Sequence, residues 1–192
     1  RQVLRADEAG RQGWHEDRRS QAVDPHATAI VLCDLWDAHW CRSAAERVEQ
    51  MIGHVSRVVE HARERGTRII HAPSGTLDFY KGSAPRERAI LARERAVAAG
   101  EGNPPLELEH DDPPLPIDDA DGGCDRRENE LAPNTPVWTR EHPGIRIEDS
   151  RDYITDDGLE VHAIVSGHGA PTGERGAAAG RACTHVFILG VH

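Results

Sequence analysis

Several features that are rare in this 192-residue chain exclude whole classes of protein. Its 4 cysteines are too few for a disulfide-based scaffold, and none forms a Cys-x-x-Cys pair, which excludes a zinc ribbon and a thioredoxin-type motif. No apolar run approaches the roughly 18 residues of a membrane span, so we expect no membrane association. Lys81 is the only lysine among 23 basic residues, and 33 acidic residues leave a net charge of −10. Such a chain lacks the basic face that nucleic-acid binding requires, so we expect no nucleic-acid partner.

The length is typical of about one domain with a core of its own. Residues 1–26 are polar and aperiodic, which predicts an N-terminal arm, and the domain is expected over 27–192. Inside this domain, residues 101–135 are rich in aspartate and proline and predict a long irregular insertion. Residues 167–182 are rich in glycine and alanine and predict a flexible connection.

Strands and helices alternate along the predicted domain. Short apolar runs predict four strands, at 28–33, 67–71, 136–139 and 185–190. Apolar residues at a 3.6-residue period predict three helices, between Ser43 and Gly66, over 84–99, and from Asp156 to Val165. Ser43 and Glu46 have the spacing of a capping box at the start of the first helix. This alternation predicts an α/β fold, a three-layer αβα domain with a mostly parallel sheet.

Ligands of parallel sheets bind beyond the carboxyl ends of the strands. The polar residues predicted at those ends are Asp34, His71, Arg140, His142 and His192. Because the strands are expected to run in parallel, we expect these residues to converge on one edge of the sheet.

The segment 34–41 is the densest candidate, with two carboxylates, an imidazole, two indoles and a thiol in eight residues. It leaves a buried strand and enters a helix, which is where active sites of α/β proteins lie. Asp34 at the strand end could act as a general base. The alternative is structural: Asp34 caps a turn, and Trp36 and Trp40 close the end of the sheet.

The cysteines leave further alternatives open. Cys41 could be a nucleophile, because a helix N-terminus favours the thiolate, or it could be packed beside an indole. Cys33 lies inside a predicted strand and is expected in the core. Spacing does not decide between a Cys41–Cys124 bridge, a Cys124–Cys183 bridge and free thiols.

A metal site is a separate alternative. Asp37, His39 and His71 offer a carboxylate and two imidazoles at the ends of neighbouring strands. The chain has no His-Glu-x-x-His or other tight ligand spacing, which weakens this interpretation.

Two terminal motifs carry a resemblance to a known family. Residues 30–36 (IVLCDLW) and 184–192 (THVFILGVH) resemble the first strand and the strand before the nucleophile in isochorismatase-like cysteine hydrolases, which include nicotinamidase-related amidases. Between them, residues 116–125 and 138–145 are similar to a subgroup of the same family. The resemblance runs from about residue 27 to residue 192.

The resemblance implies a three-layer αβα fold and a Cys–Asp–Lys triad. In this sequence the general base would be Asp34, and Trp36, His39 and Trp40 would form walls of the substrate pocket. His192 would lie near the oxyanion turn, where the Val191–His192 peptide bond would be cis. The expected reaction is attack of the cysteine on the carbonyl carbon of a small amide or related compound, followed by hydrolysis.

The sequence departs from the family pattern at two places. No cysteine stands at the nucleophile position, so we expect the nucleophile, and a continuation of the chain, beyond His192. The family lysine is missing after the third predicted strand, where Arg140 is the candidate cation, although arginine cannot act as a neutral amine.

Three functions therefore stay open. The first is the cysteine hydrolase, with a small-molecule substrate, no cofactor and a homo-oligomeric state. The second is a non-catalytic small-molecule-binding or assembly module with a degenerate triad. The third is a metal-dependent hydrolase that uses Asp37, His39 and His71. The low cysteine content favours the cytoplasm, and a removed export signal stays open.

Overall fold

A computed structural model describes residues 2–16, 18–101, 124, 131–132, 135–169 and 180–190. Several predictions fall on other positions. Most of the 101–135 insertion, most of the glycine-rich 167–182 connection, and the Val191–His192 bond with His192 itself lie outside the described residues.

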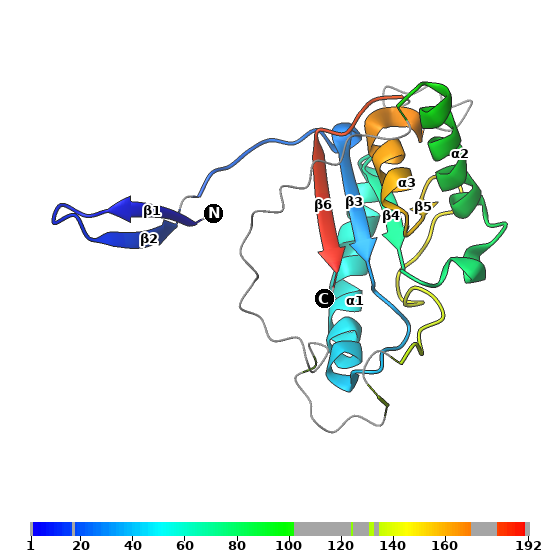
Figure 1. Cartoon of the computed structure of the whole chain (residues 1–192), viewed down its shortest axis with the longest axis horizontal. Coiled ribbons are helices and arrows are strands. Elements are labelled where there is room, and N and C mark those ends of the chain that lie inside the picture. The colour runs from blue at the N-terminus through cyan, green and yellow to red at the C-terminus, as the bar shows by residue number, and fades with distance from the viewer. Residues whose placement is uncertain are drawn as a thin grey trace.

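The centre of the fold is a four-stranded parallel sheet (Figure 1). Its strands, in spatial order, are β5 (Tyr153–Ile154), β4 (Arg68–Ala72), β3 (Thr28–Cys33) and β6 (His185–Gly190). Strand β3 lies between β4 and β6 and is almost completely buried, as a continuous apolar run in a parallel sheet should be. The predicted α/β class with a mostly parallel sheet is confirmed.

Three helices pack against the two faces of the sheet and leave most of the edge strand β6 exposed (Figure 1). They are α1 (Arg42–Glu64), α2 (Ala84–Ala98) and α3 (Gly158–Ala163). Helix α1 packs its apolar stripe on one face, against Ile30 and Leu32 of β3. Helices α2 and α3 pack on the other face, against Ala29 and Val31. Among the described helices, none has the length and apolar character needed to cross a bilayer.

The residues before the sheet contain a hairpin that their sequence does not indicate. Strands β1 (Gln2–Ala6) and β2 (Gln12–Glu16) form this antiparallel hairpin within the predicted arm. The hairpin stands apart from the sheet and helices in Figure 1, joined to them by an extended connection. Trp14 on β2 is 68% exposed, so the hairpin buries little apolar surface.

Two local predictions are wrong. No strand forms at 136–139, and the fourth strand of the sheet is instead β5, which is only two residues long. Helix α1 begins at Arg42 with Cys41 as its N-cap, so Ser43 lies inside the first turn and the capping box does not form. The Ser43 hydroxyl lies 3.2 Å from the sulfur of Cys41 instead.

Candidate functional site

Asp34 lies at the carboxyl end of the sheet, where three strands meet. The preceding residue, Cys33, pairs with Ala72 of β4 on one side and with Gly190 of β6 on the other. Asp34 is the one non-glycine residue with a positive φ (54°) among those described, a conformation that aspartate tolerates in turns. Its Oδ1 accepts a hydrogen bond of 3.0 Å from the backbone N–H of Ser74. Asp34 is half-buried and forms no ion pair with another described residue.

Close contact between β3 and β6 depends on a glycine. A Cβ atom at Gly190 would lie 2.5 Å from the carbonyl oxygen of Cys33, which is inside van der Waals contact. The absence of a side chain therefore lets the end of β6 lie directly against the end of β3. The first and last predicted strands thus end side by side, as a site shared between them requires.

A small pocket lies next to Asp34 and holds the space of about one water molecule. Its lining residues are Asp34, Trp36, Ala38, His39, Ala44, Ala45 and Val48. The last three come from the first two turns of α1. Of the predicted site residues, the structure brings Asp34, Trp36 and His39 together here. Trp40 does not line this pocket and is buried against Cys41 and Cys124.

Three rings beside this pocket are nearly parallel. Trp36 and Trp138 stack with centroids 4.4 Å apart and planes 15° from parallel. The imidazole of His39 lies 5.7 Å from Trp36 and 5.6 Å from Trp138 at similar tilts. The indole N–H of Trp36 donates to the carbonyl oxygen of Ser74, which fixes the ring. The sequence indicates Trp138 only as part of a strand, and its place in this stack is set by tertiary contacts.

Arg140, the candidate cation, is paired with Asp37. Its Nε lies 3.8 Å from Asp37 Oδ2, and its guanidinium group lies 5.4 Å from the ring centroid of Phe79. Asp37 also accepts hydrogen bonds from the N–H and hydroxyl of Thr139 and from the N–H of Arg140. Burial raises the pKa of Asp37, but these hydrogen bonds outweigh burial and hold its pKa below the usual range.

The cysteine alternatives are decided for the described residues. Cys41 and Cys124 form a disulfide, so Cys41 is not a free nucleophile in this structure. Cys33 and Cys183 are free thiols. Burial, with a contribution from the charge of Asp34, raises the pKa of Cys33, and burial also raises the pKa of Cys183. Raised pKa values disfavour the thiolate, so neither thiol is an activated nucleophile.

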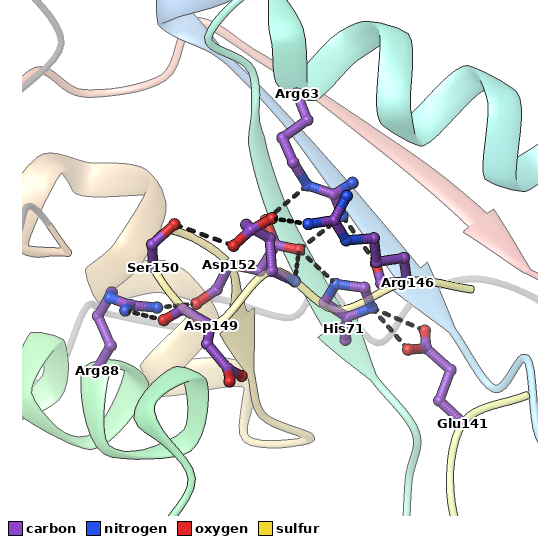
Figure 2. Close-up of polar contacts among 9 residues, drawn as sticks. Arg63, His71, Arg88, Glu141, Arg146, Asp149, Ser150 and Asp152 are labelled. Carbon is purple, nitrogen blue, oxygen red and sulfur yellow. Dashed lines mark hydrogen bonds and ion pairs between the residues drawn. The ribbon is translucent and has the colours of Figure 1, made fainter. Parts of the chain in front are cut away.

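A network of buried charged residues surrounds His71 of β4, and the contacts among these residues were not predicted from the sequence (Figure 2). His71 lies between two carboxylates: its Nδ1 is 2.7 Å from Glu141 Oε2, and its Nε2 is 3.1 Å from Asp152 Oδ2. Arg63 of α1 binds Asp152 through two nitrogens, at 3.0 and 2.6 Å. All four residues are at most 6% exposed. The one signal in the sequence is Arg63, which falls on the apolar face of α1.

The electrostatics of this network favour a protonated His71. Burial lowers the pKa of His71, but attraction and hydrogen bonds from Glu141 and Asp152 outweigh burial and raise the pKa to about 9. Burial raises the pKa of Asp152, and the hydrogen bonds from His71 and Arg63 bring it below its usual value. Two buried positive groups therefore balance two buried negative groups.

The predicted metal ligands do not form a site. Asp37 is bound by Thr139 and Arg140, His39 stacks on two tryptophans, and His71 is enclosed in the buried network. Over the described parts of the chain, no group of three or more His, Cys, Asp and Glu side chains is arranged to hold a metal ion.

Comparisons with known proteins assign this chain to no family. No protein-family model, no curated protein and no solved structure matches the chain. The function must therefore be inferred from the site itself.

Proposed function

We propose that this chain carries the general base of a cysteine hydrolase of the isochorismatase-like type, which acts on a small amide or related carbonyl compound. The position of Asp34 is the observation that supports this proposal most directly. Asp34 follows the central strand β3, lies beside the end of β6, and forms no ion pair with another described residue. The carboxyl edge of a parallel sheet is the usual place for such a site.

The two carboxylate oxygens of Asp34 differ in their contacts, and Oδ2 is the one that we propose transfers the proton. The other oxygen, Oδ1, accepts the hydrogen bond from Ser74, whereas Oδ2 makes no hydrogen bond to another described residue. In the proposed reaction, Asp34 accepts the proton of a cysteine thiol that follows β6, beyond His192. The thiolate attacks the carbonyl carbon, and the proton passes from Asp34 to the departing amine as the carbon–nitrogen bond breaks. Water then hydrolyses the resulting thioester and regenerates the thiol.

The pocket has space for about one water molecule, so binding of a small organic substrate requires the pocket to widen between its aromatic side chains and α1. Trp36 and His39 form one wall beside Asp34, and alanines of α1 form the other. Arg140 is the proposed cationic partner of the thiolate. In this structure it lies near Asp37, so this role requires its side chain to turn from Asp37 toward Asp34.

A second function is favoured by that same pairing. If Arg140 stays with Asp37, no cation serves a thiolate, and the chain is a small-molecule-binding module with a degenerate triad. The two functions share the pocket and differ in turnover. A test must therefore measure hydrolysis and binding separately.

The test compares two carboxylates that bind the same loop. Asp34 accepts from the N–H of Ser74, and exposed Asp156 accepts from the N–H of Gly75 at 2.9 Å. In the full-length protein, we expect D34N to lower kcat on a panel of small amides by about 100-fold or more, whereas D156N retains kcat. Iodoacetamide should inactivate the wild-type protein, and a metal chelator should not.

Three outcomes would count against the hydrolase. Equal kcat values for D34N and the wild type would show that Asp34 is not the general base of the reaction. Inactivation by the chelator alone would favour metal chemistry. Binding of amides by calorimetry without any turnover would favour the non-catalytic module.

A further inference from the structure

Residues 139–142, which we call the strap, lie along the loop that follows Asp34. The N–H of His142 donates to the carbonyl oxygen of Leu35 at 2.7 Å, and the N–H of Asp37 donates to that of Arg140 at 3.0 Å. Between these bonds, Trp36 and Glu141 form an isolated antiparallel bridge. The strap therefore holds the backbone of residues 35–37, directly after the proposed general base.

A buried ion pair anchors the strap to the sheet. Glu141, in the middle of the strap, reaches His71 on β4 at 2.7 Å, and both side chains are at most 2% exposed. The N–H of Glu141 also donates to the hydroxyl of Tyr80 at 2.9 Å. Figure 2 shows His71 between Glu141 and Asp152. Through His71, the strap is joined to Asp152 and to Arg63 of α1.

The burial of these charges restricts the strap to one position. A carboxylate out of water is costly unless it is paired and hydrogen-bonded, and removing one partner of a buried pair leaves the other uncompensated. Any displacement of the strap would separate Glu141 from His71. The strap is therefore held more firmly by this pair than an exposed loop is held by surface contacts.

We propose that His71 and Glu141 are positioning residues, whose buried pair fixes the strap and thereby the placement of Asp34 and of the Trp36–Trp138 stack. The catalytic part of this inference rests on the proposed function. The geometric part does not, because the stack has a signal of its own. Two indoles in contact couple their electronic transitions, which gives a paired band in the far-ultraviolet circular dichroism spectrum.

The strap offers a matched pair of glutamates for the test. Glu141 binds His71 in the interior, whereas Glu49 binds His142 of the same strap at 2.9 Å with a side chain that is 74% exposed. We expect E141Q to lose most of the tryptophan band and E49Q to keep it. Trp138→Phe provides the reference circular dichroism spectrum, because this variant lacks the coupled pair of indoles.

Activity gives a second measurement on the full-length protein. A displaced general base should lower kcat far more than it raises KM, because misplacement of about 1 Å can cost on the order of 100-fold in rate. E141Q should show this pattern, and E49Q should match the wild type. A folded E141Q protein that keeps the band would overturn the inference, even if its melting temperature falls.

If E141Q does not fold, the inference can be tested on the wild-type protein instead. The groups that face His71 are Glu141 from the strap, Asp152 before β5, and Arg63 behind Asp152. Raising the pH until His71 loses its proton should weaken the tryptophan band, and an unchanged band would overturn the inference. If the wild type hydrolyses no amide but the band behaves as expected, the proposed function fails and the positioning role stands.

Discussion

The buried histidine at position 71 should make the stability of this protein fall as the pH rises from neutral toward 9. In the folded protein, Glu141 and Asp152 enclose His71 and raise its pKa from 6.5 to about 9. In the unfolded chain these contacts are lost, and the pKa of His71 returns to an ordinary value. The folded state therefore binds this proton more tightly than the unfolded state does.

The size of the effect follows from the two pKa values. A rise from 6.5 to about 9 corresponds to roughly 3 kcal/mol of unfolding free energy, at about 1.4 kcal/mol per pKa unit. This contribution is fully present below pH 6.5. It declines as the pH rises through the window between 6.5 and about 9, and it is lost above the folded-state pKa.

The assay is urea unfolding at a series of pH values across this window, on the wild type and on two variants. His71→Gln removes the buried titrating group. His61→Gln is the control, because His61 is 64% exposed and lies 3.9 Å from Glu64 on the surface of α1. We expect the free energy of unfolding to fall with pH in the wild type and in H61Q, and to stay nearly level in H71Q.

Equal pH dependence in the wild type and H71Q would refute the reasoning. If H71Q does not fold, the ring proton resonance of His71 in the wild type decides the question by NMR. Titration of that resonance at or below 6.5 would show that burial outweighs the attraction of Glu141 and Asp152 for the protonated ring.

Two further predictions concern the close contact between β3 and β6 and the disulfide at the start of α1. G190A should lower the free energy of unfolding by about 1–3 kcal/mol, because its Cβ would collide with the carbonyl oxygen of Cys33, whereas G158A meets open space and should be neutral. Equal melting temperatures for the two variants would contradict this. Reduction of the Cys41–Cys124 bridge should cost up to about 4 kcal/mol, because the bridge closes a loop with a sequence separation of 83. Urea unfolding with and without a thiol reductant measures it, and coincident curves would count against it.

The elements that the sequence predicted well are those with a strong local signal. Strands β3 and β6 are largely runs of apolar residues, β4 has the apolar pair Ile69–Ile70, and α1 keeps its 3.6-residue period over 23 residues. In β3 and along the inner face of α1 these apolar residues are buried, whereas Val186, Phe187 and Ile188 of β6 are 45%, 48% and 71% exposed. Asp34 was identified for a related reason, since the residue after a buried strand must lie at the edge of the sheet.

The elements that the sequence did not predict depend on distant partners. β5 has two residues, and only pairing with β4 makes it a strand. Residues 136–139 have an apolar pair that is typical of a strand, but Trp138 stacks on Trp36 and Thr139 binds Asp37 instead. A pattern of four residues does not distinguish these two uses of an apolar side chain.

By itself, the sequence determined the main strands, the long helix on one face, and an acid at the end of the central strand, because each is a pattern of residues close together in the chain. Tertiary structure alone decided which charges enter the interior. His71 meets Glu141 and Asp152 across separations of 70 and 81 residues, and Arg63 meets Asp152 across 89. Burial of a charge is tolerated only once its partner is in place, so the local pattern indicates Arg63 on the apolar face of α1 but not the residues that it meets.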